Sequence, residues 1–144
     1  MDNFVGDGIF IDSPAEKIFA GLLDPEDILV WMDAEEVRID PVEGGEISVR
    51  RFDGSTVTGV LRNLKPGESL DIADYHWEKA GCRRGPMLVR FTIEPRHGGH
   101  WVTVCQENLD CPVSGGEVWQ TFARGVQKEW VAATVALKRH IDGI

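Results

Sequence analysis

The chain has 144 residues, of which 42% are hydrophobic and 27% are charged, a balance typical of one folded domain with a substantial core. Its formal net charge of −9 disfavours binding to nucleic acid and to anionic lipid. No apolar run approaches the roughly 18 residues of a membrane span, and no basic segment precedes the first apolar stretch, so we expect neither membrane insertion nor a signal peptide.

The first part of the chain predicts one strand followed by two short helices. Residues 4–11 alternate around two glycines, which suits a strand. Ser13 fits the N-cap of a helix and Pro14 its first position. The apolar side chains that follow recur at helical spacing, namely Ile18, Phe19, Leu22 and Leu23. The Asp24-Pro25 pair ends this helix and caps a second, shorter one.

A run of six strands separated by turn residues is expected next. Their ranges are 36–40, 46–52, 56–64, 69–77, 87–94 and 100–107. The strand at 69–77 mixes two parities, because Leu70 and Ile72 share one face whereas Tyr75 and Trp77 share the other. A β-bulge near residues 73–74 reconciles them. We predict a loop over 78–86.

From about Gly115 to Ile141 the apolar period becomes helical. The stripe consists of Trp119, Phe122, Val126, Trp130, Ala133, Leu137 and Ile141. A helix of about 27 residues is roughly 40 Å long, and only the concave face of a curved sheet is long enough to bury this stripe. The sequence therefore predicts one α+β domain over residues 1–144, in which a curved antiparallel sheet of about seven strands wraps a long C-terminal helix.

This order of elements is the helix-grip arrangement, and particular segments extend the likeness. SPAEKIFAGLLDPEDILVWM (13–32) resembles the opening of the START-like (SRPBCC) superfamily, in the branch similar to the activator of the heat-shock-protein-90 ATPase. Further matching pieces follow in the expected order, namely DPVEGGEISVR (40–50), GVLRNLKPGESL (59–70), VRFTIEPRHGGHWVTV (89–104) and Trp130. The resemblance implies the fold and not a reaction, because the superfamily includes lipid carriers, hormone-binding proteins, cyclases and co-chaperones.

Three departures from the pattern of that family fall on or near surfaces expected to face inward. Gln106 stands where many relatives carry His, and Glu129 stands where a Gly often precedes the helix Trp. The strand at 69–77 lacks the usual Leu-x-Phe-x-Trp parity. The cavity chemistry of a relative is therefore not transferred to this chain.

The candidate ligand-binding residues are those expected to line the space between the sheet and the long helix. They are Leu61, Tyr75, Trp77, Val89, Phe91, Val104, Gln106, Trp119, Phe122, Val126 and Trp130. For each one the alternative is plain core packing, and for Gln106 it is a hydrogen bond to a strand end or to the helix. Hairpin alternation places the connections 52–55, 78–86 and 108–115 at one end of the sheet, beside the start of the helix, where we expect the mouth.

No catalytic set, metal site or cofactor motif is predicted. Asp74 and His76 form an acid–imidazole pair by spacing, but the expected bulge points them to solvent. His97 and His100 flank Gly98-Gly99, which predicts a hairpin turn and not a metal site. Three cysteines without CxxC spacing favour a reducing compartment, so we expect a cytoplasmic protein.

Three functions stay open on the sequence alone. The first is a carrier or sensor that binds a small apolar or amphipathic ligand in the cavity. The second is a protein-interaction module like the co-chaperones, with a protein partner and no ligand. The third is a cyclase- or hydrolase-like enzyme, which needs at least two convergent polar groups. A filled interior would favour the second.

Overall fold

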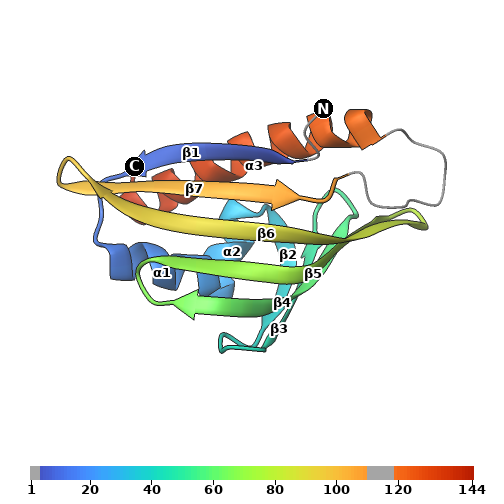
Figure 1. Ribbon diagram of the computed structural model, residues 1–144, viewed down its shortest axis with the longest axis horizontal. Helices are drawn as coiled ribbons and strands as arrows, with labels where there is room; N and C mark the ends of the chain where they lie inside the picture. Colours follow the sequence, from blue (N-terminus) through green and yellow to red (C-terminus); the bar gives the residue numbers. More distant parts are fainter. Residues whose placement is uncertain (1–3, 110–118) are drawn as a thin grey trace.

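The computed structural model describes residues 4–109 and 119–144, and of Trp119 only the backbone. It confirms the α+β helix-grip prediction. The seven-stranded antiparallel sheet has the order β1-β7-β6-β5-β4-β3-β2, and the helices lie together on one side of it (Figure 1). In chain order the elements are β1 (Val5–Ile11), α1 (Ala15–Leu23), α2 (Pro25–Trp31), β2 (Ala34–Ile39), β3 (Glu46–Arg51), β4 (Thr56–Lys65), β5 (Ser69–Lys79), β6 (Cys82–Arg96), β7 (Gly99–Glu107) and α3 (Trp119–Asp142). The start of the long helix predicted at Gly115 lies outside the described residues.

The start of α1 differs from the prediction. Pro14 is the N-cap residue, and Ser13 instead donates its hydroxyl to Asp142 at the end of α3, at 2.6 Å. Burial disfavours the charged form of Asp142, but hydrogen bonds from Ser13, the Asp12 N–H and Lys138 outweigh it and lower the pKa of this carboxyl. Ser13 therefore fastens the start of α1 to the end of α3 through a charge-assisted hydrogen bond.

The break between the two short helices is confirmed. The Asp24 carboxylate accepts a hydrogen bond from the Glu26 N–H at 2.8 Å, and Pro25 is the first residue of α2. This satisfies one of the N–H groups that a helix start leaves without a partner. The cap fixes the turn of α2 back over the sheet, where Trp31 is buried.

The predicted bulge in β5 is confirmed. Between Ile72 and Tyr75 the pairing register shifts against β6, and Asp74 has a φ of 50°. The bulge brings Tyr75 to the buried face that Ile72 already occupies. Asp74 is exposed and His76 is half-buried, and the ring of His76 contacts the carbonyl of Asp74 and no acid side chain.

The loop predicted over 78–86 is wrong. β5 continues to Lys79 and β6 begins at Cys82, so only Ala80 and Gly81 connect them. Both residues have positive φ values, 52° and 83°, which is the geometry of a two-residue hairpin turn matched to the strand twist. Cys82 therefore lies in a paired strand, and Cys111 lies outside the described residues.

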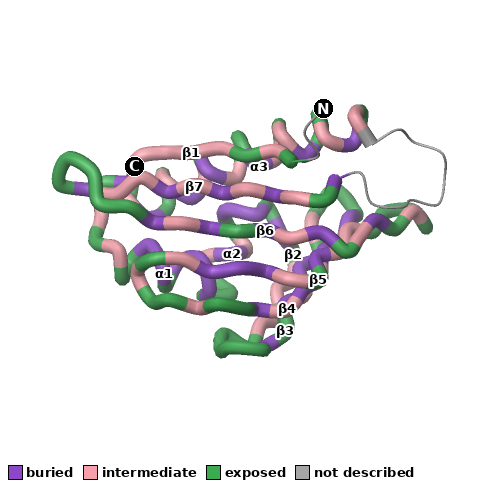
Figure 2. Tube along the Cα trace, in the orientation of Figure 1, coloured by how far each residue is buried: buried purple, intermediate pink, exposed green. Residues whose placement is uncertain are grey.

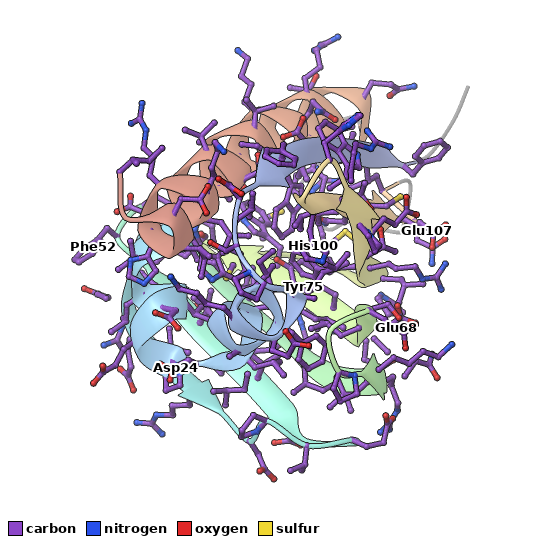
Figure 3. The ribbon with its side chains drawn as sticks, turned by 90° about the vertical axis from the view of Figure 1, so that its left-hand side faces the viewer. Asp24, Phe52, Glu68, Tyr75, His100 and Glu107 are labelled. Carbon is purple, nitrogen blue, oxygen red and sulfur yellow. The ribbon has the colours of Figure 1, made fainter. Side chains whose placement is uncertain are left out.

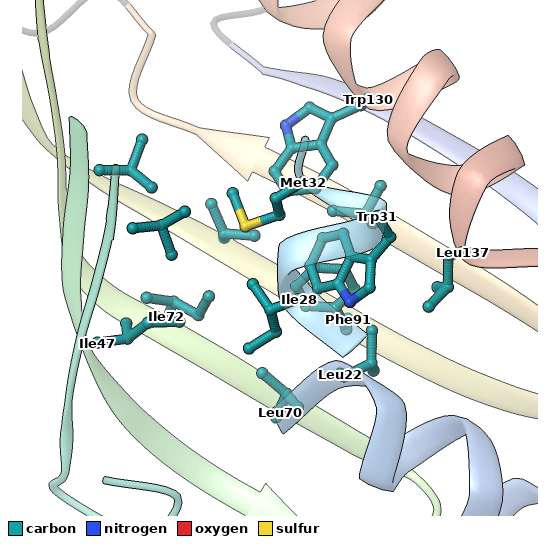
Figure 4. Packing of buried hydrophobic residues seen from close by; sticks show 14 of the residues in the cluster. Leu22, Ile28, Trp31, Met32, Ile47, Leu70, Ile72, Phe91, Trp130 and Leu137 are labelled. Carbon is teal, nitrogen blue, oxygen red and sulfur yellow. The ribbon is translucent and has the colours of Figure 1, made fainter. Parts of the chain in front are cut away.

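The core fills the space between the inner face of the sheet and the three helices. Buried residues alternate with more exposed ones along the strands, as expected for a sheet with one covered face (Figure 2). The α3 stripe contributes Phe122, Val126, Trp130, Leu137 and Ile141, all buried. Phe91 of β6 packs edge-on against Trp31 of α2 and Trp130 of α3, with ring centroids 5.9 and 5.7 Å apart (Figure 4). Each such side chain stabilises the fold by about 1.5–3 kcal/mol relative to exposure.

Candidate functional site

A pocket lies between the first half of α3 and the adjoining ends of β3, β4 and β5. Its walls are Met32, Arg51, Val57, Tyr75, Trp77, Gln106, Phe122, Val126, Glu129, Trp130 and Ala133. The open space inside it is about 30 Å³, the share of one water molecule in the liquid. The side chains of the wall residues fill the rest of the volume between the sheet and α3 at this place. Trp77 and Phe122 close one side, with ring centroids 5.2 Å apart.

Gln106 is the deepest polar group of the pocket, at 2% exposure. Its Oε1 accepts a hydrogen bond from the Trp130 Nε1–H at 2.9 Å, and its Nε2 donates to the Met87 sulfur at 3.1 Å. On the sequence alone, a hydrogen bond between Gln106 and the long helix was an alternative to ligand binding, and the structure has this hydrogen bond. A thioether is a weak acceptor and Nε2 carries two hydrogens, so the amide keeps donor capacity while its oxygen is engaged.

Tyr75 places a phenol hydroxyl in the pocket wall. Its side chain is 6% exposed, and the hydroxyl makes no hydrogen bond with any residue that the structure describes. Figure 3 shows this residue in the interior, whereas Phe52 projects from the surface. Burial raises the pKa of Tyr75, Arg51 opposes the rise and Glu129 adds to it. The phenol therefore stays protonated and is a hydrogen-bond donor at neutral pH.

An ion pair closes the pocket on its outer side. Arg51, at the end of β3, donates from Nε to the Met32 carbonyl at the end of α2 at 3.0 Å, and its Nη1 lies 3.1 Å from the Glu129 carboxylate. The Asp53 carboxylate is 4.0 Å from the same nitrogen. The arginine side chain is 16% exposed and that of Glu129 41%. Beyond this pair a surface groove runs between α2 and α3, and its walls include Met32, Arg51, Glu129 and Ala133 as well.

The structure brings six of the eleven predicted ligand residues to this pocket. They are Tyr75, Trp77, Gln106, Phe122, Val126 and Trp130. Leu61, Val89, Phe91 and Val104 are buried in the adjoining core and do not border the pocket, and the side chain of Trp119 lies outside the described part of the chain. The pocket occupies the end of the sheet where the mouth was expected, beside the connection 52–55.

Five of the wall residues were not among the predicted ligand-binding residues, namely Met32, Arg51, Val57, Glu129 and Ala133. A signal for Arg51 was present, because it alternates onto the same face of its strand as the buried Ile47 and Val49. A charged residue at the end of an inward-facing row is a recognisable candidate for a site.

The three departures from the family pattern meet in this one pocket. Gln106 and Glu129 both border it, and the altered parity of β5 is the bulge that brings Tyr75 to the wall. The pocket therefore combines an apolar lining with the polar groups of Tyr75, Gln106 and Glu129.

Neither a metal-binding cluster nor a membrane-spanning helix occurs in the described residues. No group of three or more His, Cys, Asp or Glu side chains within 4–109 and 119–144 is arranged to hold a metal ion. His97 sits in the β6–β7 turn with a φ of 50°, and His100 contacts the Ser13 carbonyl through Nδ1 at 2.8 Å. Across the same residues no helix has the length and apolarity to cross a membrane.

Comparison with known proteins supplies the family. The family model described as "Activator of Hsp90 ATPase homolog 1-like protein" matches residues 12–142. The chain belongs to this family. The match agrees with the START-like branch that the sequence resembles, and no curated protein matches the chain.

Solved structures share the fold of this Hsp90-activator-like family member at low sequence identity. Protein MLL2253 from Mesorhizobium loti is 21% identical with a TM-score of 0.74, and the match covers 97% of each chain. Aha1 from Colwellia psychrerythraea, solved as a dimer in solution, is 19% identical with a TM-score of 0.73 over 96% of each chain. CalU16 from Micromonospora echinospora is 18% identical with a TM-score of 0.69, over 96% of this chain and 75% of that one. These likenesses show the fold alone.

Proposed function

We propose that this domain is a carrier or sensor that binds a small amphipathic molecule in the pocket between the sheet and α3. The observation that carries the proposal is the Tyr75 hydroxyl, a donor that borders the open space of an apolar pocket and has no partner among the described residues. A water or a bound molecule in that space would accept its hydrogen, and Phe at this position would need neither. A bound molecule that accepts a hydrogen bond from this hydroxyl would explain why a Tyr, and not a Phe, occupies position 75.

A ligand larger than one water requires the walls to move. Trp77 and Phe122 each come from the end of an element, and Arg51 and Glu129 form only a partly exposed pair on the outer side. Arg51 and Glu129 border both the inner space and the groove between α2 and α3, so rotating these two side chains would join the two spaces. The opening would break their ion pair and the hydrogen bond from Arg51 to the Met32 carbonyl.

The second candidate is a protein-interaction module, and the filled interior favours it. An open space of about 30 Å³ would then be an ordinary packing defect, and exposed apolar side chains would be the contact surface. Phe52 is 66% exposed on the β3–β4 connection. The third candidate, an enzyme, gains less support, because Tyr75 is held protonated and so does not act as a base.

The test uses prodan, a neutral naphthyl ketone whose emission shifts to the blue in an apolar site. We expect saturable binding by the native protein at micromolar concentrations. Ala133→Leu fills the pocket and should weaken binding at least about tenfold, a loss of about 1.4 kcal/mol. Ala132→Leu is the matched control, because Ala132 is the preceding residue of α3 and borders only the outer groove.

Three outcomes are informative. Loss of binding in Ala133→Leu alone supports a ligand in the pocket. Equal loss in both variants places the dye in the surface groove and overturns the proposal. Absence of any binding by the native protein also overturns it and favours the interaction module.

A further inference from the structure

We propose that the pocket selects uncharged molecules that carry a carbonyl oxygen and rejects carboxylates of the same shape. The inference rests on the ligand-binding function proposed above. It follows from two separate properties of the pocket wall: its polar groups have hydrogens to donate, and its one described cation, Arg51, is already paired with Glu129.

The interior polar groups offer hydrogens that have no strong acceptor among the described residues. The Tyr75 hydroxyl is an unengaged donor, and the Gln106 Nε2 is directed at the weak Met87 thioether acceptor. The carbonyl oxygen of Gln106 already accepts the Trp130 indole N–H. A ligand that brings an acceptor oxygen completes these hydrogen bonds, whereas a ligand without an acceptor leaves the phenol O–H and the Gln106 Nε2–H without a strong acceptor.

The charges at the outer wall work against an anion. Arg51 is the one cation among the described wall residues, and it is already engaged by Glu129, by Asp53 and by the Met32 carbonyl. Glu129, the one anion among the described wall residues, thus occupies Arg51 where a head group would lie. A ligand carboxylate would have to displace Glu129 or lose its hydration beside it, and like charges at this separation repel. A ketone, ester or amide oxygen brings no charge.

The experiment measures displacement of prodan by three naphthalenes with one substituent at the same ring position. Acetylnaphthalene supplies a neutral carbonyl, naphthoate a carboxylate and ethylnaphthalene neither. At pH 7 we expect acetylnaphthalene to compete at least about tenfold more strongly than naphthoate and about three- to tenfold more strongly than ethylnaphthalene, as one hydrogen bond provides. The indole N–H resonance of Trp130, assigned with Trp130→Phe, should shift on binding.

Two variants separate the two properties. Tyr75→Phe removes only the unpartnered hydroxyl, so it should lower the affinity for acetylnaphthalene about three- to tenfold and leave ethylnaphthalene unchanged. Glu129→Gln keeps the shape and removes one charge, so it should raise the affinity for naphthoate relative to that for acetylnaphthalene about tenfold.

The result that overturns the inference is distinct from failure of the proposed function. If prodan binds in the pocket but the three competitors are equivalent, or naphthoate is preferred, the selection for a neutral carbonyl is wrong while ligand binding stands. If Glu129→Gln leaves naphthoate as weak as before, the charge argument is wrong. If prodan does not bind at all, the proposed function itself has failed.

Discussion

The hydrogen bond between Trp130 and Gln106 ties α3 to β7 inside the core, and a double-mutant cycle measures it. Both residues are buried, and the indole N–H lies 2.9 Å from the amide oxygen. Gln106→Leu keeps the volume and leaves the indole N–H without an acceptor, so it should destabilise the fold by about 1–3 kcal/mol. Trp130→Phe leaves the amide without its donor and also removes ring volume beside Phe91, so we expect about 2–4 kcal/mol.

In the double variant both polar partners are gone, and no orphaned group remains. Its destabilisation should therefore fall short of the sum of the single changes by about 1–2 kcal/mol. Urea unfolding of the four proteins at pH 7 gives the free energies, provided that the slopes are equal. Additivity within about 0.5 kcal/mol would refute the reasoning, because Gln106 would then not be held in the core by this bond.

Three further predictions follow from local contacts. Asp142→Asn should lower the free energy of unfolding by about 1–3 kcal/mol at pH 7. Because the pKa of Asp142 is lowered in the folded protein, its carboxylate stabilises the fold above the unfolded pKa of about 3.9. In acid-unfolding curves the stability difference between the variant and the native protein should therefore shrink as the pH falls below that value. Gly59→Ala should destabilise by about 1–3 kcal/mol in thermal unfolding, since a Cβ would collide with the Ile72 side chain opposite the bulge. Deleting residues 130–144 should abolish cooperative unfolding, because it removes the half of α3 that includes the buried Leu137.

The fold was predictable because it depends on periodicity. Strict alternation predicted the strands, and a helical stripe predicted α3. The same parity argument predicted that Gln106 faces inward with Val102 and Val104, and all three are buried. The bulge in β5 was predictable too, since two apolar pairs of opposite parity in one strand require an extra residue between them.

What the sequence did not predict depends on contacts between distant segments or on rare backbone states. Ser13 was predicted as a helix cap because capping rules are local, whereas its observed partner, Asp142, comes from the far end of the chain. Arg51 and Glu129 meet only after β3 and α3 are placed. The β5–β6 turn was taken for a loop because Ala80 adopts a positive φ, which alanine rarely does.

The bulge in β5 gives a final prediction, because the pairing register of β5 shifts at this point against both of its neighbouring strands, β4 and β6. On β6, Ile72 pairs with Val89 and Tyr75 pairs with Met87, so two residues of β5 face one residue of β6. On the other side the register against β4 also shifts between residues 58 and 60. Asp74 is exposed and has a φ of 50°, a conformation that costs a residue other than glycine about 1–2 kcal/mol.

Deleting Asp74 should therefore remove the shift between Ile72 and Tyr75 against β6 and the matching shift against β4, and leave Tyr75 facing the pocket; the second shift against β6, between Tyr75 and Trp77, would remain. The loss of one strained, exposed residue offsets the loss of the extra twist that the bulge provides, and we expect a folded protein within about 2 kcal/mol of the native stability. Deleting His76 is the control, since removing a residue beyond the bulge turns Trp77 to the outer face. Thermal unfolding of both deletions decides the matter. If the Asp74 deletion unfolds as readily as the His76 deletion, the bulge is required by the sheet itself and is not a local device that sets the direction of Tyr75.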